Sequence, residues 1–72
     1  MKKNIELEKL ADRIKSVRAE KGISQEELAY LSSLDRTYIS LLERAKRNPS
    51  YYNLFKLSKG LDISLSDLLK GL

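Results

Sequence analysis

Residues 23–44 read ISQEELAYLSSLDRTYISLLER, and this stretch contains two helix starts that lie close together in the chain. At each start an apolar residue precedes a capping residue and a second apolar residue follows, which is the pattern of a hydrophobic staple around an N-cap. The capping residues are Ser24, with Glu27 completing a capping box, and Asp35. Only residues 32–34 lead into the second cap, and so short a connection forces two short helices to cross steeply.

The rest of the chain repeats these helical signals. The same staple surrounds Ser50 and Ser64, apolar residues recur at three- and four-residue spacings, and there are only three glycines and one proline. Gly22 is placed to end the first helix in a left-handed conformation. We therefore expect an all-α fold and a single domain over residues 1–72. The sequence predicts five short helices at 5–21, 25–32, 36–45, 51–60 and 65–71.

The composition argues against several classes of protein. The 72 residues include no cysteine and no histidine, which removes disulfides, thiolate metal sites and the usual general base at neutral pH. We therefore expect no enzyme, no metal and no cofactor. We also expect no small-molecule ligand, because so small a domain suggests no evident cavity. No apolar run approaches the roughly 20 residues of a membrane span, and no signal-peptide pattern follows Met1. These features favour a cytoplasmic protein without a membrane partner.

Positive charge is concentrated in one third of the chain. Residues 1–35 carry seven basic and seven acidic side chains, residues 36–59 carry six basic ones against Glu43 alone, and residues 60–72 have a net charge of −1. This concentration indicates a surface that faces a polyanion, although a merely solvated basic face explains the charge equally well.

The helix predicted at 36–45 has two contrasting faces at about 100° per residue. One side carries Ile39 and Leu42, and the other carries Arg36, Thr37, Ser40, Leu41 and Arg44. Arginine offers a bidentate donor to guanine, and the hydroxyls of threonine and serine suit bases or phosphate. Arg36 and Thr37 directly follow the cap, where a recognition helix reaches base edges. The pattern favours a DNA-binding helix-turn-helix, and an ordinary helical hairpin is the alternative.

Residues 23–29 (ISQEELA) and 38–43 (YISLLE) resemble the lambda-repressor-like (Cro/Xre) helix-turn-helix family. Residues 35–40 (DRTYIS), together with 47–50 (RNPS), resemble the small controller proteins of restriction–modification systems. The resemblance implies a five-helix, all-α homodimer with its helix-turn-helix unit at about 24–44. It also implies that the protein binds a near-palindromic operator in double-stranded DNA and regulates transcription.

The same resemblance implies roles for individual residues. The positions that match base contacts are Arg36, Thr37 and Ser40. The positions that match contacts to the DNA backbone, or that lie near it, are Gln25, Tyr38, Arg47 and Asn48. We expect the basic residues Arg44 and Lys46 of the same segment to contact the backbone too, although Lys46 could merely aid solubility. Arg18 and Glu43 match a pair that forms an internal ion pair in family members, so Glu43 is assigned to structure.

Three positions depart from the family pattern. Ser33 stands where the turn usually has glycine, so we expect a left-handed conformation there at a cost of roughly 1 kcal/mol. Asp62 also stands where glycine is common, and aspartate tolerates this conformation better than most residues. Leu41 occupies a position that is often polar in base readers.

Two further groups have both a structural and a functional interpretation. Tyr51 and Tyr52 could contact DNA, but we expect one of them to cover the core and the other to be half exposed. Lys2, Lys3 and Asn4 could form an arm for the minor groove, but we expect a frayed end instead.

The C-terminal helix, at about 64–71, carries more leucines than a small core can bury. A leftover apolar patch usually marks an interface, and a symmetric dimer would use the patch twice. Such a dimer would place two recognition helices about 34 Å apart. We expect the contact to be formed by Leu61, Leu65, Leu69 and Leu72. The alternative is that these leucines only cap the core.

A second functional hypothesis is a protein-interaction module. The antitoxin of a toxin–antitoxin pair often uses the same fold. Such a chain would bind a protein partner through its last helix, and its DNA binding would be secondary.

Overall fold

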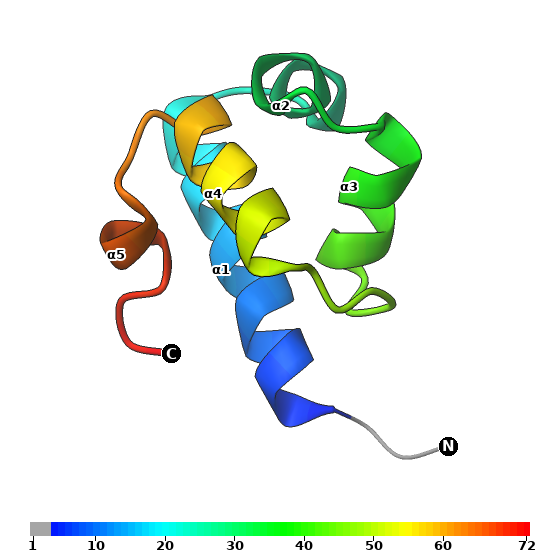
Figure 1. The fold of residues 1–72 in the computed structure, drawn as a ribbon, viewed down its shortest axis with the longest axis vertical. Helices are drawn as coiled ribbons and strands as arrows, with labels where there is room; N and C mark the ends of the chain where they lie inside the picture. Colours follow the sequence, from blue (N-terminus) through cyan, green and yellow to red (C-terminus); the bar gives the residue numbers. More distant parts are fainter. Residues whose placement is uncertain (1–3) are drawn as a thin grey trace.

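The computed structural model describes residues 4–72, and within that range the chain forms five α-helices and no β-strand (Figure 1). The helices are α1 (Ile5–Lys21), α2 (Gln25–Ser32), α3 (Arg36–Glu43), α4 (Tyr51–Gly60) and α5 (Leu65–Leu68). The predicted all-α fold is confirmed, and every predicted helix is present. In Figure 1, α2 crosses one end of the molecule, and α3 and α5 lie on opposite sides of α4.

Each helix begins at a side chain that accepts a hydrogen bond from the first turn. The four predicted caps are confirmed at Ser24, Asp35, Ser50 and Ser64. At Ser24 the capping box is complete, because its Oγ accepts from the backbone N–H of Glu27 while its own N–H donates to Glu27 Oε1, each at 3.0 Å. These bonds satisfy N–H groups that have no partner inside a helix.

The start of α1 is more ordered than we expected. Asn4 Oδ1 accepts from the backbone N–H of Leu7 at 3.0 Å and caps the helix, so the expectation that Asn4 frays is wrong. Lys2 and Lys3 lie outside the described residues.

Two helices end earlier than predicted. Helix α3 stops at Glu43, because Ala45 adopts a φ of 57° and the N–H of Lys46 donates back to the carbonyl of Leu41 at 2.8 Å. Helix α5 stops at Leu68 rather than residue 71. Beyond it, the N–H of Leu72 reaches back only three residues, as in the tighter turns that close helix ends.

Three other left-handed residues lie where we expected them. Gly22 ends α1 with a φ of 68°, and its N–H donates to the carbonyl of Ala19. Ser33 has a φ of 56° in the turn between α2 and α3, and Asp62 has a φ of 58° before α5. The chain therefore adopts the turn conformations of the family at these two positions without glycine.

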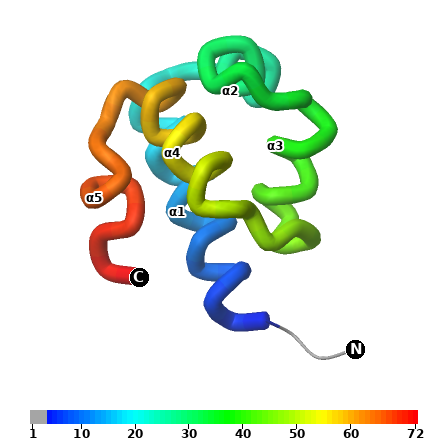
Figure 2. Tube along the Cα trace, viewed as in Figure 1, coloured from blue at the N-terminus to red at the C-terminus, as the bar shows by residue number. Residues whose placement is uncertain are grey.

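All five helices contribute to one hydrophobic core, in which α2 packs against α3 and α4 while α1 packs against α3 and α5 (Figure 2). Its buried apolar residues are Ala11, Ile14, Val17, Leu28, Ala29, Ile39, Leu42, Leu57, Leu61 and Leu68. Burying a leucine side chain contributes about 1.5–3 kcal/mol, so this core fixes the positions of the helices. The prediction that Leu61 forms a dimer contact is wrong, because its side chain is only 1% exposed within the protomer.

Helices α2 and α4 approach each other closely at Gly60. A Cβ atom on Gly60 would lie 3.0 Å from both Cβ and the backbone nitrogen of Ser32. The buried Ser32 itself donates its hydroxyl to the carbonyl of Leu28 at 2.6 Å. Glycine at position 60 thus allows the contact that holds the helix-turn-helix unit against α4.

Candidate nucleic-acid interface

Helix α3 has the two faces that the sequence predicts. Ile39 and Leu42 are buried in the core and fix the orientation of the helix. Arg36 and Thr37, in the first turn, are exposed on the opposite side. Ser40 is half-buried, so its hydroxyl is less accessible than the two side chains before it. The structure therefore brings the three predicted base-contact residues onto one helix face.

A buried ion pair holds the end of α3 against α1. Arg18 Nε donates to Glu43 Oε2 at 2.7 Å, and a second guanidinium nitrogen donates to Glu43 Oε1 at 3.0 Å. Glu43 is 4% exposed, and a third nitrogen of Arg18 donates to the carbonyl of Ile23 at 2.9 Å. The geometry is the bidentate one that makes arginine–carboxylate pairs strong. The expected structural pair is present.

The electrostatics of this pair follow from its hydrogen bonds. The bond to Glu43 raises the pKa of Arg18 above its ordinary value, against an opposing effect of burial and with a further contribution from the carboxylate charge. A raised pKa means that the contribution to stability is complete below the ordinary value and is lost only at strongly alkaline pH. The pair therefore holds α3 throughout the neutral range.

Gln25 is tied into the same cluster. Its Nε2 donates to Glu43 Oε1 at 3.0 Å, so the side chain is part of the contact between α2 and α3. Gln25 is also the first residue of α2, where backbone N–H groups have no partner inside the helix. One side-chain N–H of Gln25 is therefore already bound to Glu43. The predicted contact of Gln25 with the DNA backbone has to use its other polar groups.

Tyr38 lies between two polar neighbours. The guanidinium of Arg47 lies 5.5 Å from the centroid of the Tyr38 ring, and the Tyr38 hydroxyl accepts from Asn53 Nδ2 at 3.0 Å. The sequence analysis missed Asn53. No local pattern connects it to Tyr38, because the contact joins α3 to the start of α4.

The segment after α3 presents further positive charge. Arg44, Lys46, Arg47 and Asn48 are all exposed. Among residues 4–72 the two ion pairs are Arg18–Glu43 and Lys15–Asp12, so no carboxylate pairs with these cations. Cations free of carboxylates are available to phosphates, and the segment adjoins the outward face of α3.

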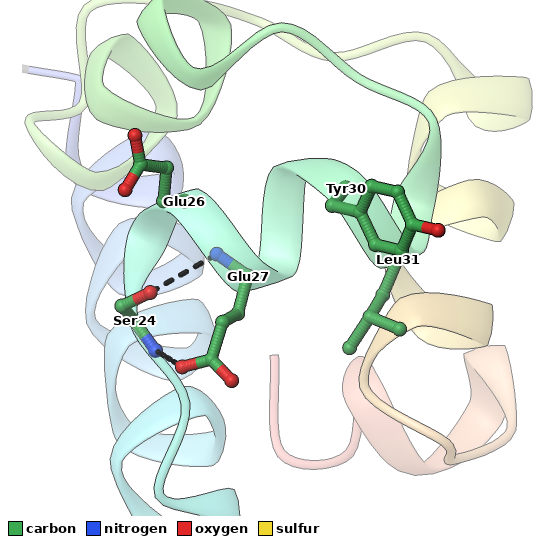
Figure 3. Close-up of a pocket in the computed structure, with 5 residues that line it drawn as sticks. All are labelled: Ser24, Glu26, Glu27, Tyr30 and Leu31. Carbon is green, nitrogen blue, oxygen red and sulfur yellow. Dashed lines mark hydrogen bonds between the residues drawn. The ribbon is translucent and has the colours of Figure 1, made fainter.

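The outward face of α2 has the opposite character. Figure 3 shows Glu26, Tyr30 and Leu31 on this face, beside the capping box that joins Ser24 to Glu27. Both carboxylates are exposed, and α2 contains no basic residue. Because a polyanion is repelled by such a face, the outward face of α2 is unsuited to binding one.

A second, apolar surface lies on α5 and the chain after it. Leu65 and Leu69 are half-buried, and Leu72 is 52% exposed. Phe55 of α4 is also exposed. With Leu61 excluded, the predicted dimer surface is reduced to the three leucines at 65, 69 and 72.

Tyr51 and Tyr52 differ from our expectation. Both are exposed, at 75% and 63%, so neither covers the core. Lys56 Nζ lies 5.0 Å from the centroid of the Tyr52 ring, which gives that ring a cation as a neighbour. The hydrophobic staple at Ser50 instead involves Leu54, which packs against the core.

Residues 4–72 contain no group of three histidine, cysteine or acidic side chains positioned to hold a metal ion. No helix in this part of the chain has the length and apolar character needed to cross a membrane.

The comparisons with known proteins agree with this geometry. A family model for helix-turn-helix proteins matches residues 14–68. The control protein C.MunI from Mycoplasma sp is 45% identical over 65 residues, which are 89% of this chain and 88% of that protein. The restriction–modification controller protein C.AhdI from Aeromonas hydrophila has a similar crystal structure, with a TM-score of 0.89 and 44% identity over 92% of this chain and 100% of that one.

A second similar structure is a complex. It contains the restriction–modification controller protein C.Esp1396I as a tetramer bound to its natural 35-base-pair operator. The TM-score is 0.89 at 44% identity, over 94% of this chain and 90% of that one. The chain belongs to the lambda-repressor-like (Cro/Xre) helix-turn-helix family of DNA-binding regulators, and is similar within it to the controller proteins of restriction–modification systems.

Proposed function

We propose that this protein is a sequence-specific transcription regulator that binds a near-palindromic operator as a homodimer. The observation that carries the proposal is the orientation of α3. Its apolar face is locked into the core and its last residue into a buried ion pair, while Arg36 and Thr37 point outward from the first turn. A helix held in this way presents its N-terminal side chains to the major groove.

Base readout is assigned to the outward side chains of α3. Arg36 is exposed and can donate two hydrogen bonds to a guanine. Thr37 offers a methyl group and a hydroxyl from the adjacent position. Ser40 lies one turn further on and contributes a shorter hydroxyl.

Contacts to phosphates position the protein on the duplex. We assign them to Gln25 at the start of α2, to Tyr38 of α3 and to the exposed segment that follows α3. That segment contains Arg44, Lys46, Arg47 and Asn48. Because these contacts release counterions, the affinity falls steeply as the salt concentration rises.

Dimerisation is assigned to the apolar surface of Leu65, Leu69 and Leu72. Helix α5 lies on the opposite side of α4 from α3, so a partner on α5 leaves the DNA-facing side chains free (Figure 1). A protomer measuring 32 × 25 × 22 Å is large enough for two such copies to place their α3 helices about 34 Å apart.

The relatives favour one biological role. The control protein C.MunI and the operator-bound C.Esp1396I are controller proteins by name, so we propose that this chain controls a restriction–modification system. These relatives are regulators rather than enzymes. They support this role over the antitoxin-type module, and a controller acts in the cytoplasm, where bacterial operator DNA is found.

The proposal is tested by comparing two variants, Arg36→Ala and Lys46→Ala, on duplexes selected for binding. Arg36→Ala should lower the affinity by about 5- to 150-fold, equivalent to about 1–3 kcal/mol, and relax the preference at one position in each half-site. Lys46→Ala should weaken all sequences about equally and reduce the salt slope by about one. Fluorescence anisotropy over a series of salt concentrations measures both effects.

Both side chains are exposed, so circular dichroism should show that each variant keeps the wild-type fold. If Arg36→Ala weakened all duplexes equally, Arg36 would be a phosphate contact. If it changed no affinity, the outward face of α3 would not be the reading surface.

A further inference from the structure

Helix α5 is too short to be stable by itself, yet it and the residues after it carry the leucines of the proposed dimer surface. Its four residues form one turn, and a single turn fixes several backbone dihedrals in return for very few hydrogen bonds. Leu68 is fully buried and anchors the turn in the core. The residues on either side of this anchor, Leu65 and Leu69, are only half-buried, and Leu72 is largely exposed.

Arg13 of α1 donates two side-chain hydrogen bonds to the end of α5. Its Nε donates to the carbonyl oxygen of Leu68 at 3.0 Å, and its Nη2 donates to the carbonyl oxygen of Asp67 at 2.7 Å. These two carbonyls belong to the last residues of the helix, where acceptors have no partner within the helix itself. The Asp67 carbonyl also accepts a longer bond, of 3.3 Å, from the backbone N–H of Lys70 beyond the helix. The guanidinium also places a positive charge at the negative end of the turn.

The side chain of Arg13 binds backbone carbonyls that are 54 and 55 residues away in the sequence. Within residues 4–72, Arg13 forms no ion pair with a carboxylate, so its hydrogen bonds to these carbonyls are its polar contacts in the fold. Arg13 is followed by the buried Ile14, which fixes this part of α1 in the core. The guanidinium therefore connects a fixed helix to the turn that carries the apolar surface, and α5 lies beside α1 in Figure 1.

We propose that Arg13 is a positioning residue for self-association, which holds α5 and the residues after it in the arrangement that a second copy binds. The inference rests on the proposed dimerisation through Leu65, Leu69 and Leu72. An apolar surface that is already ordered loses less conformational freedom on binding, and this raises affinity without adding a contact. Arg13 thus affects the dimer without touching the partner.

The test uses the full chain with Arg13→Gln, and Lys9→Gln as the matched control. Lys9 is an exposed lysine on α1, so the control removes the same charge from the same helix. Sedimentation equilibrium measures the dimer dissociation constant. At a concentration where the chain is monomeric, nitrogen-15 relaxation measures the backbone order of residues 65–72, and urea denaturation measures stability.

Arg13→Gln should raise the dimer dissociation constant about tenfold, the effect expected for losing two modest hydrogen bonds. It should lower the backbone order of residues 65–72 while α1 to α4 keep theirs, and Lys9→Gln should change neither quantity. Arg13→Lys, which keeps the charge but not the paired donors, should fall between Arg13→Gln and the wild type.

Unchanged order in residues 65–72 would overturn the proposal, because Arg13 would then not position α5. A loss of order and stability spread evenly over all five helices would overturn it as well, since Arg13 would then only stabilise the fold. Leu72→Glu separates this inference from the proposed function. If Leu72→Glu left the dimer intact, the proposed dimer surface itself would be wrong. If Leu72→Glu weakened the dimer while Arg13→Gln did not, the surface would stand and the role of Arg13 would fail.

Discussion

Helices α3 and α5 both turn side chains outward, but they are built and held differently. Helix α3 has eight residues, two buried apolar side chains and a buried carboxylate paired with Arg18. Helix α5 has four residues, one buried leucine and two backbone carbonyls bound by Arg13. An arginine of α1 holds each helix. Arg18 binds the side chain of Glu43 in α3, and Arg13 binds the backbone of α5.

The difference matches what each surface is proposed to do. Reading bases requires side chains placed within a fraction of an ångström, and α3 is held along its whole length. An apolar contact between two copies depends on area and order rather than on hydrogen-bond geometry. A single anchored turn is sufficient for that contact as long as its end is fixed.

Removing the anchor of α5 should have the largest effect. Leu68→Ala should lower the free energy of unfolding by about 2–5 kcal/mol, because it leaves a cavity at a fully buried site. Leu72→Ala, four residues away and exposed, should change the unfolding of the monomer by less than about 0.5 kcal/mol. Urea denaturation at low protein concentration measures both. Equal losses for the two variants would mean that residue 72 belongs to the core of the protomer.

Breaking the anchor of α3 should have the next largest effect. Glu43→Ala should lower the free energy of unfolding by about 2–3 kcal/mol, because Arg18 loses a bidentate partner in a site shielded from water. Asp12→Ala removes the exposed ion pair with Lys15 and should cost at most about 0.5 kcal/mol. The two variants are compared by urea denaturation at neutral pH. A cost for Glu43→Ala as small as that for Asp12→Ala would show that apolar packing alone holds α3.

The turns that lead into the two helices should give the smallest effects. Ser33→Gly should raise the free energy of unfolding by about 0.5–1 kcal/mol, because glycine adopts the left-handed conformation without strain. Asp62→Gly should raise it less, since aspartate tolerates that conformation. Ser16→Gly, in the middle of α1, should lower it by about 0.5 kcal/mol. Thermal unfolding compares all three, and a loss in Ser33→Gly would contradict the strain at residue 33.

The two helices also show how far the sequence predicts the structure. Their starts were predictable, because Asp35 and Ser64 are local signals that act within one turn. Their ends were not. Ala45 ends α3 in a left-handed conformation that alanine seldom adopts, and the carbonyls at the end of α5 are bound by Arg13, which is distant in sequence.

The candidate site follows the same division. The outward face of α3 was predictable from helical periodicity, and the Arg18–Glu43 pair from the family resemblance. The burial of Leu61 and the bond from Asn53 to Tyr38 were not, because each depends on how α4 packs against its neighbours. A leucine in a helical pattern does not indicate by itself whether it faces the core or a partner.

The central claim, a dimer that reads sequence through α3, is tested most directly by selecting bound duplexes from a random DNA library at low and at physiological salt. The account predicts a near-palindromic consensus, with half-sites about one helical turn apart, that persists at physiological salt. Binding without sequence preference that disappears as the salt concentration rises would contradict it. The basic residues between 36 and 59 would then form a general polyanion surface, and the function would have to be sought in a protein partner of α5.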